Sequence, residues 1–262
     1  MTERIAVFGG VYSNHLALAA LLEDAPRRGA SRIYCLGDLG AFGPHPDKVF
    51  PLLRDATVPV VQGNYDNSVG NNLADCQCGY TDPKDNYFAR LSYDYTFRNT
   101  NAENKEWMRG LPAEIRLEIN GVRVLLCHGS PRKTNEFLWE TTTSAAFLER
   151  LCEAYAADVI VGTHTGLHWH RALPSGRHFV NCGAIGRPAN DGRTNVWYAL
   201  LSIDDAKRVD LQFVPLEYDH EQLAAEMRAE QLPNEFVHTI ESGLWTTCLE
   251  VLPTKERARG VF

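Results

Sequence analysis

Short runs of branched apolar residues recur along the chain, and they constrain its fold more than any other feature. Such runs predict buried β-strands, at residues 4–8, 32–36, 58–62, 122–127, 158–162, 178–182, 196–203 and 209–216. Segments with helical periodicity separate the early runs, whereas the later runs follow one another closely. This order predicts an α/β protein with a mixed sheet, or two packed sheets, and helices outside.

Residues typical of helix starts precede several of the intervening segments. Ser13 is a suitable N-cap for a helix with one apolar face, and Pro46 suits the first turn of the next helix. Thr100 and Glu103 have the spacing of a capping box before a short helix. Two further helices are expected at about 141–156 and 219–230.

The length and composition are those of an ordinary globular protein. The chain has 262 residues, of which 44% are hydrophobic and 23% charged, and this is enough to bury one large core. We therefore expect a single domain over residues 1–262. Residues 67–100, rich in Asn, Asp, Tyr and Cys, are expected to form an irregular insertion near the functional site, as a substrate cap or as a contact in a homo-oligomer.

The formal net charge of -7 and the sequence pI of about 5.7 limit the partners. A broad basic surface for long nucleic acid or for an anionic membrane is not expected. A small phosphorylated substrate remains compatible, because a metal ion or a helix N-terminus can attract an anion locally. No apolar run approaches the roughly 18 to 20 residues that span a bilayer, and the first residues lack the features of a signal peptide. We expect a cytoplasmic protein.

The seven cysteines are scattered and odd in number, which favours reduced thiols over a disulfide framework. Only Cys76 and Cys78 are close enough in sequence to act together. Because no second Cys or His pair stands at the spacing of a zinc site, we interpret these two as incidental loop thiols in preference to metal ligands.

Four of the predicted strands are followed by a residue that can ligate a metal ion. These residues, within CLGDLG, VQGNYD, LLCHGSP and VGTHTG, are Asp38, Asn64, His128 and His164. Strand ends on one edge of a sheet bring such residues together whatever their separation in sequence. A carboxylate, an amide and two imidazoles suit Mn, Fe, Zn, Ni or Co better than calcium. Each residue alone has a structural explanation, as a turn residue, a cap or a buried histidine, but four coincidences favour a metal site.

The segments GDLGAFGPHP, GNYD, LLCHGSP, THTG and NCGAIGRP follow one another along the chain. In this order they resemble the motifs of the calcineurin-like metallophosphoesterases, most closely those of the small bacterial and archaeal phosphodiesterase type. The resemblance implies a four-layer αββα sandwich whose metal centre lies at the carboxyl ends of the strands. It also implies metal-ligand roles for Asp38, Asn64, His128 and His164, with Asp38 as the former bridging ligand.

The resemblance fails at four positions, which all belong to one of the family's two metal ions and to the catalytic group beside it. The family's Asp-x-His after the first strand is replaced by Gly10 and Tyr12. The second His of its Gly-His-Thr-His motif aligns with Gly166, and the His of its Gly-Asn-His-Asp motif aligns with Tyr65. The first metal site is therefore degenerate, which implies a centre rebuilt for one ion, or a second ion that is held differently.

Other residues near the motifs could replace the lost groups. Tyr12 and Tyr65 are candidate catalytic donors, although a phenol is a weaker acid than histidinium, and the resemblance gives Asp66 the role of orienting residue 65. The candidate compensating ligands are His168 and His15. The candidate substrate-binding residues are Asn14, His45 and Arg187, the last as a cation for a second phosphate. A packing or surface role is the alternative for each of them.

These residues predict a metal-dependent phosphoesterase that hydrolyses a small phosphomonoester or phosphodiester, such as a nucleotide, with one or two ions. A single ion can still bind a phosphoryl oxygen and generate hydroxide near neutral pH if it keeps an open coordination position. The alternative is a catalytically impaired protein on the same scaffold, which binds metal or phosphate for regulation. Fold alone does not distinguish the two, because function resides in the site.

Overall fold

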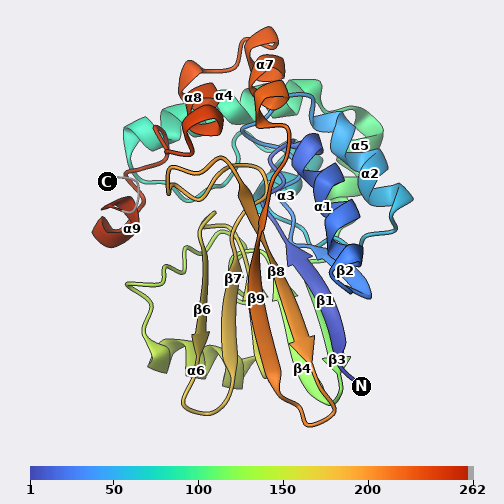
Figure 1. Cartoon of the computed structure of the whole chain (residues 1–262). Helices are drawn as coiled ribbons and strands as arrows, with labels where there is room; N and C mark the ends of the chain where they lie inside the picture. Colours follow the sequence, from blue (N-terminus) through green and yellow to red (C-terminus); the bar gives the residue numbers. More distant parts are fainter. Residues whose placement is uncertain (259–262) are drawn as a thin grey trace.

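The computed structural model describes residues 1–258, and two β-sheets packed face to face form its centre (Figure 1). The four-stranded sheet has the order β2-β1-β8-β9, with β1 at Glu3–Phe8, β2 at Arg32–Cys35, β8 at Val196–Ile203 and β9 at Val209–Leu216. The five-stranded sheet has the order β3-β4-β5-β7-β6, with β3 at Glu114–Ile119, β4 at Val122–Cys127, β5 at Val159–Gly162, β6 at His168–Ala172 and β7 at His178–Cys182. Both sheets mix parallel and antiparallel pairs.

Successive residues of a strand point to opposite faces, and this alternation divides the core into layers. In β1, Ile5 and Val7 belong to the cluster between the two sheets, whereas Ala6 and Phe8 belong to the cluster under the helices. The cluster between the sheets also contains Val124 and other inward residues of β4, β5 and β7. The contact between the sheets is therefore an apolar layer to which both contribute.

Helices cover the outer face of each sheet (Figure 1). On the four-stranded sheet, α1 (His15–Arg27) and α2 (Val49–Asp55) share a core cluster with Phe8. On the five-stranded sheet, α6 (Ala145–Ala154) packs Leu148 near Phe179. The remaining helices are η1 (Pro46–Lys48, a 3₁₀ helix), α3 (Asn64–Gly70), α4 (Pro83–Asn99), α5 (Ala102–Arg109), α7 (His220–Ala229), α8 (Asn234–Ser242) and α9 (Thr254–Ala258). These layers confirm the predicted α/β sandwich with helices outside.

The segment 67–100, predicted to be irregular, is mostly helical, and this corrects the prediction. It contains the end of α3 and the whole of α4. Asp82 caps α4 by accepting from a backbone N–H of its first turn, and Phe88 and Tyr93 pack into the core. Asn and Asp are poor helix formers that dilute the apolar face, and for this reason the composition concealed the helix.

Three local predictions also differ from the structure. Asn14 caps α1 in place of Ser13, which lies one residue earlier with a φ of 60°. Asn101 caps α5 in place of Thr100. The run 58–62 forms only an isolated bridge to β2, while β3 and β6 were not predicted because charged residues and histidines interrupt their apolar pattern.

Parallel pairing decides where the strands end. β1 is parallel to β2, and β4, β5 and β7 are parallel to one another. Their carboxyl ends therefore lie at the helical end of the sandwich, at the top of Figure 1, and the loops that follow them meet there. Within residues 1–258, no helix is long and apolar enough to cross a membrane.

Candidate metal centre

Three of the predicted ligands lie together at this edge. Asp38 follows β2, His128 follows β4 and His164 follows β5. One donor atom of each lies within 4.8 Å of the others, with His128 Nε2 at 3.2 Å from Asp38 Oδ2 and 3.2 Å from His164 Nδ1. None of the three is more than 7% exposed. Strand ends from both sheets thus converge on one buried point.

The backbone holds the His128 ring in one orientation. Its Nδ1 is 2.6 Å from the carbonyl oxygen of Leu36. An N–H on Nδ1 donates to that oxygen, which turns Nε2 toward Asp38 and His164. Metal-binding histidines are commonly fixed by a contact of this kind on the nitrogen that does not ligate.

The charges of the three residues depend on one another. Burial opposes the charged form of His128, but the Asp38 carboxylate outweighs burial and the pKa of His128 is raised. Burial also opposes ionisation of Asp38, yet the neighbouring His128 lowers the pKa of that carboxyl. Burial and the charge on His128 lower the pKa of His164 to about 3. His164 is therefore a neutral imidazole beside an ionised carboxylate, and both forms can ligate a divalent metal ion.

Asn64, the fourth predicted ligand, opens α3 beside Asp38. Its Nδ2 donates to the Cys76 carbonyl oxygen at 2.8 Å and lies 3.6 Å from Cys78 Sγ. Its Oδ1 is buried and has no hydrogen-bond partner in the described part of the chain. The N–H of Tyr65, the next residue, donates to Asp38 Oδ1 at 3.0 Å. An unpartnered buried amide oxygen is costly, and a metal ion bound beside Asp38 would give it a partner.

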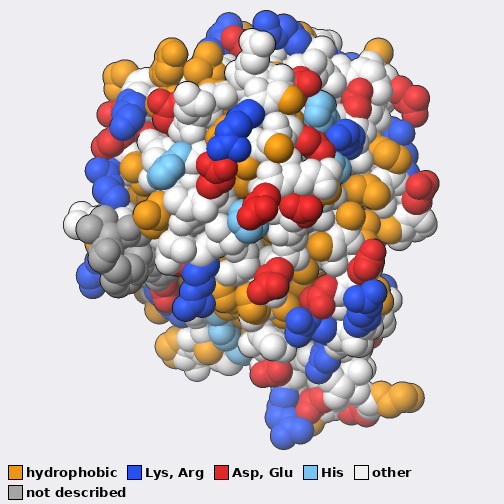
Figure 2. All heavy atoms as spheres, turned by 45° about the horizontal axis from the view of Figure 1, so that its top comes forward, with side chains coloured by type: hydrophobic (Ala, Val, Ile, Leu, Met, Phe, Trp, Pro, Cys, Tyr) orange, Lys and Arg blue, Asp and Glu red, His pale blue; other side chains and the backbone are white. Residues whose placement is uncertain are grey.

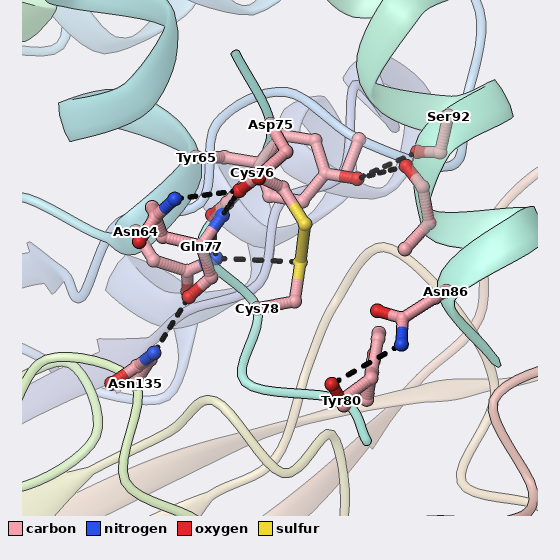
Figure 3. The surroundings of a disulfide bond; sticks show 12 residues. Asn64, Tyr65, Asp75, Cys76, Gln77, Cys78, Tyr80, Asn86, Ser92 and Asn135 are labelled. Carbon is pink, nitrogen blue, oxygen red and sulfur yellow. Dashed lines mark hydrogen bonds between the residues drawn. A yellow bond between two sulfur atoms is a disulfide. The ribbon is translucent and has the colours of Figure 1, made fainter. Parts of the chain in front are cut away.

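A disulfide joins Cys76 and Cys78 beside Asn64 (Figure 3). The prediction of reduced thiols is therefore wrong for this pair, while the other five cysteines are free. The loop before α4 brings the two Cα atoms within 5.3 Å of each other, a distance that permits a bridge and that no count of cysteines reveals. The residue between the two cysteines, Gln77, is also held, because Asn135 Nδ2 donates to its carbonyl oxygen at 2.7 Å. The bridged loop thus supplies the acceptor that orients Asn64.

A buried carboxylate and left-handed backbone shape the loop that carries Asp38. Asp38 and His164 have φ values of 55° and 68°, a conformation that costs a non-glycine residue about 1–2 kcal/mol. Asp66 accepts hydrogen bonds of 2.8–3.0 Å from three backbone N–H groups, those of Asp38, Leu39 and Gly63. Burial and the charge of Asp38 raise the pKa of Asp66 to about 6. These contacts make Asp66 a residue that positions Asp38, while the expected role of Asp66 in catalysis, as the residue that orients residue 65, stays a prediction.

The two tyrosines predicted as donors line one cavity with Asp38 but have different neighbours. Tyr65 OH donates to Ser92 Oγ on α4 at 3.0 Å. The ring of Tyr12 lies 5.8 Å from the Arg187 guanidinium. Burial raises the pKa of both phenols well above the usual value, so both hydroxyls keep their protons at neutral pH. Their catalytic role stays a prediction.

Four other predicted residues are not brought to the metal group. The side chain of Asn14 caps α1 and donates to a backbone carbonyl oxygen. The rings of His15 and His45 face the carboxylate of Glu226, at 3.6 and 3.7 Å. The ring of His168 packs against two aromatic side chains, those of Trp197 and Phe213. Closeness to a motif in sequence does not decide where a side chain points, since neighbouring residues point in different directions.

A cavity of about 50 Å³ adjoins the metal group. Arg187, on the loop after β7, lines it together with Asp38, Asn64 and His164. Arg187 is 7% exposed, and its guanidinium carbon lies 3.5 Å from the ring centroid of Trp245. The sequence gave no signal for Trp245, because it lies far beyond the last motif. A permanently charged guanidinium at the wall of this cavity favours an anion inside it.

Comparison with protein families and curated proteins gives consistent matches. The model of the calcineurin-like phosphoesterase superfamily domain matches residues 4–206. In sequence, the chain is similar to an uncharacterised protein of Methanocaldococcus jannaschii, with 26% identity over 238 residues that cover 87% of this chain and 93% of the relative.

Solved structures with the same architecture include two that align with nearly the whole chain. A metallophosphoesterase from Sphaerobacter thermophilus has a TM-score of 0.70 and 26% identity, with 93% of this chain and 100% of that chain covered. A hypothetical protein from Pyrococcus horikoshii has a TM-score of 0.75 and 20% identity, with 93% of this chain and 99% of that chain covered. The likeness to the second protein concerns the fold alone.

Proposed function

The chain belongs to the calcineurin-like phosphoesterase superfamily, a group of phosphoric ester hydrolases, and on this premise we propose that it hydrolyses a small phosphomonoester or phosphodiester with one divalent metal ion. The residues that would hold the ion are Asp38, Asn64, His128 and His164. The observation that supports this most is the buried Asn64 Oδ1, which lacks a partner within residues 1–258. Mixed nitrogen and oxygen donors suit Mn, Fe, Zn, Ni or Co.

The residues around the ion have complementary tasks. When bound, the ion supplies Lewis acidity and lowers the pKa of a water molecule that it ligates. Arg187 offers positive charge and N–H donors to phosphoryl oxygens, and these interactions are stronger in a buried cavity than in water. Tyr12 keeps its proton and lies beside Arg187, so it can donate a hydrogen bond to the same anion. Asp66 holds the backbone of Asp38 in place.

The cavity and the surface both favour a small substrate. A cavity of about 50 Å³ has room for a few groups of the size of water, enough for a phosphoryl group, so the rest of the ester must extend outside it. On the face shown in Figure 2, basic and acidic side chains are interspersed and no broad basic area is present. Long nucleic acid would need such an area to bind its phosphates. A nucleotide is one candidate of suitable size.

Substitution of Asp38 by alanine tests the proposed hydrolysis. Activity is measured with p-nitrophenyl phosphate, bis-p-nitrophenyl phosphate and a panel of nucleotides, with Mn or Zn added. We expect Asp38→Ala to lose at least about 100-fold, because even groups behind the ligands contribute 10- to 100-fold. The matched control is Asp210→Ala, an exposed carboxylate on β9, which should keep full activity. Unchanged metal-stimulated activity in a folded Asp38→Ala protein would contradict the proposal.

A catalytically impaired protein that binds metal or phosphate is the second candidate, and Tyr65 favours it. Tyr65 stands where the resemblance expects a histidine, and its hydroxyl is engaged with Ser92. Because its pKa is far above neutrality, it is a poor proton donor for a leaving group. This candidate predicts metal and phosphate binding without hydrolysis of any ester in the panel. Binding and turnover measured on one preparation separate the two candidates.

A further inference from the structure

The residues at the degenerate metal site do not fit a second metal ion. Gly10 and Gly166 offer no side-chain donor, and both have left-handed φ values, 52° and 75°. A Cβ on Gly10 would lie 2.9 Å from Cζ of the Tyr12 ring. A Cβ on Gly166 would lie 3.2 Å from two ring carbons of Trp245 and 3.5 Å from Arg187 Nη2. Aromatic rings and a guanidinium therefore lie next to positions 10 and 166, from which the side chains of metal ligands would have to reach a second ion.

We propose that Arg187 is the second cation of the site and binds the phosphoryl oxygens of the substrate directly, where the family resemblance expects a second metal ion. The ligand class is a tetrahedral oxyanion, held between Arg187 and the metal group. This inference rests on the proposed function and deepens it, because it assigns the charge that a one-metal centre lacks. In a two-metal centre, two ions together stabilise the attacking and the leaving oxygens of the reaction.

Aromatic rings hold Arg187 in a fixed position. Its guanidinium carbon lies 3.5 Å from the ring centroid of Trp245, and 5.8 and 5.9 Å from those of Tyr12 and Phe42. Trp245 is itself anchored, because its Nε1 donates to the carbonyl oxygen of Pro188 at 2.6 Å. A guanidinium that stacks through its face keeps its N–H donors at the edge. These donors are available to an anion in the cavity that Arg187 lines.

The described part of the chain does not neutralise this cation. Arg187 is 7% exposed, and its Nε has no hydrogen-bond partner within residues 1–258. The side chain that faces it at 5.8 Å is the phenol ring of Tyr12, which is not a carboxylate. An unpaired buried charge is strongly unfavourable, so the arrangement suits an anion that enters from outside. Asp38 and His164, which line the same cavity, belong to the metal group.

A guanidinium differs from a metal ion in two measurable ways. It stays charged at any pH that the protein tolerates, and a chelator cannot remove it. The protein should therefore saturate at one metal ion per chain, even in excess Mn. Part of its affinity for phosphate should also survive chelation.

Variants of Arg187 test the proposal by binding, independently of turnover. Inorganic phosphate is titrated calorimetrically into metal-loaded and chelator-treated protein, and metal content is measured by elemental analysis. We expect Arg187→Gln to keep one metal per chain and to lose about tenfold or more in phosphate affinity in both states, since charge-assisted bonds are the strong ones. Arg187→Lys should recover only part, because an ammonium lacks the planar fork. The control is Arg150→Gln on the exposed side of α6, which should bind as the natural protein does.

Three outcomes would overturn the proposal. One is an unchanged phosphate affinity in folded Arg187→Gln. If the glutamine variant does not fold, the corresponding outcome is an Arg187→Lys variant that binds phosphate as tightly as the natural protein. Another is two metal ions per natural chain. The third is a second metal ion bound by the triple variant Gly10→Asp, Tyr12→His, Gly166→His while Arg187 is present. Failure of the proposed function would look different, since no ester would be hydrolysed while Arg187→Gln still lost phosphate binding.

Discussion

Two groups of residues at or next to the cavity share a backbone setting and differ in chemistry. We call them the metal half, comprising Asp38, Asn64, His128 and His164, and the arginine half, comprising Tyr12, Arg187 and Trp245. Asp38 follows β2 and Tyr12 follows β1, and both have left-handed backbone, with φ values of 55° and 49°. The metal half presents carboxylate, amide and imidazole donors, whereas the arginine half presents rings and a fixed cation. The sheet edge supplies positions, and the side chains decide whether a metal binds there.

Glycines serve both halves in the same way, by leaving room for a larger functional side chain. In the metal half, a Cβ on Gly63 would lie 2.3 Å from Asp38 Oδ1. In the arginine half, a Cβ on Gly166 would press on the ring of Trp245. The glycines next to the arginine half therefore leave the space that the neighbouring aromatic rings fill. A metal site that had only lost its ligands would not be expected to show this fit.

The largest expected contrast compares one substitution in each half. His164→Ala removes a ligand, so we expect the affinity for Mn to fall by at least about 100-fold, more than a group behind the ligands contributes. Tyr12→Phe removes only a hydroxyl on the other side and should leave metal affinity unchanged. Calorimetric titration of chelator-treated protein with Mn measures both. Equal losses in the two variants would mean that the halves are not independent.

A smaller effect should follow when the bridge between Cys76 and Cys78 is removed. The double variant Cys76→Ser, Cys78→Ser keeps the carbonyl that orients Asn64 but frees its loop, so metal affinity should fall about tenfold, as for other groups behind ligands. A thiol reductant should have the same effect on the natural protein. Phosphate binding by the chelator-treated protein should not change, because it depends on the arginine half. Cys152→Ala, a free cysteine on α6, is the control, and unchanged metal affinity in the double variant would show that the bridge does not orient Asn64.

The sequence predicts the metal half better than the arginine half for a physical reason. A donor that follows an apolar run is a local signal, and parallel strands bring such donors together, so Asp38, His128 and His164 were expected to meet. The two packed sheets and the flanking helices were predicted from the order of the runs and from the motifs, and both are confirmed. The ligand roles themselves stay predictions.

The parts that escaped prediction depend on contacts between distant segments. Trp245 reaches Arg187 because the chain after α8 folds back over the site, and stacking of a guanidinium on a ring has no sequence pattern. The bridge between Cys76 and Cys78 depends on the shape of one loop. Asn14 and His168 are of residue types found in such sites, but Asn14 caps a helix and His168 packs against aromatic rings. Tertiary structure sets the direction in which each side chain points.

The smallest effect concerns two glycines with similar backbone and different neighbours. Gly166 and Gly176 have φ values of 75° and 82°, so alanine costs each about 1–2 kcal/mol through left-handed strain. A Cβ on Gly176 would meet nothing within 4 Å, whereas one on Gly166 would lie 3.2 Å from the Trp245 ring. We therefore expect Gly166→Ala to lose about 1 kcal/mol more of unfolding free energy than Gly176→Ala, through overpacking.

The same pair of variants reports on the arginine half through a second measurement. If the new methyl group displaces Trp245, the platform under Arg187 moves with it, and phosphate affinity should fall in Gly166→Ala while Gly176→Ala binds normally. Denaturant unfolding gives the stability difference, and phosphate titration gives the binding difference. Equal destabilisation with equal phosphate affinity would show that Trp245 can yield without moving Arg187, and the aromatic platform would then not be what fixes the cation.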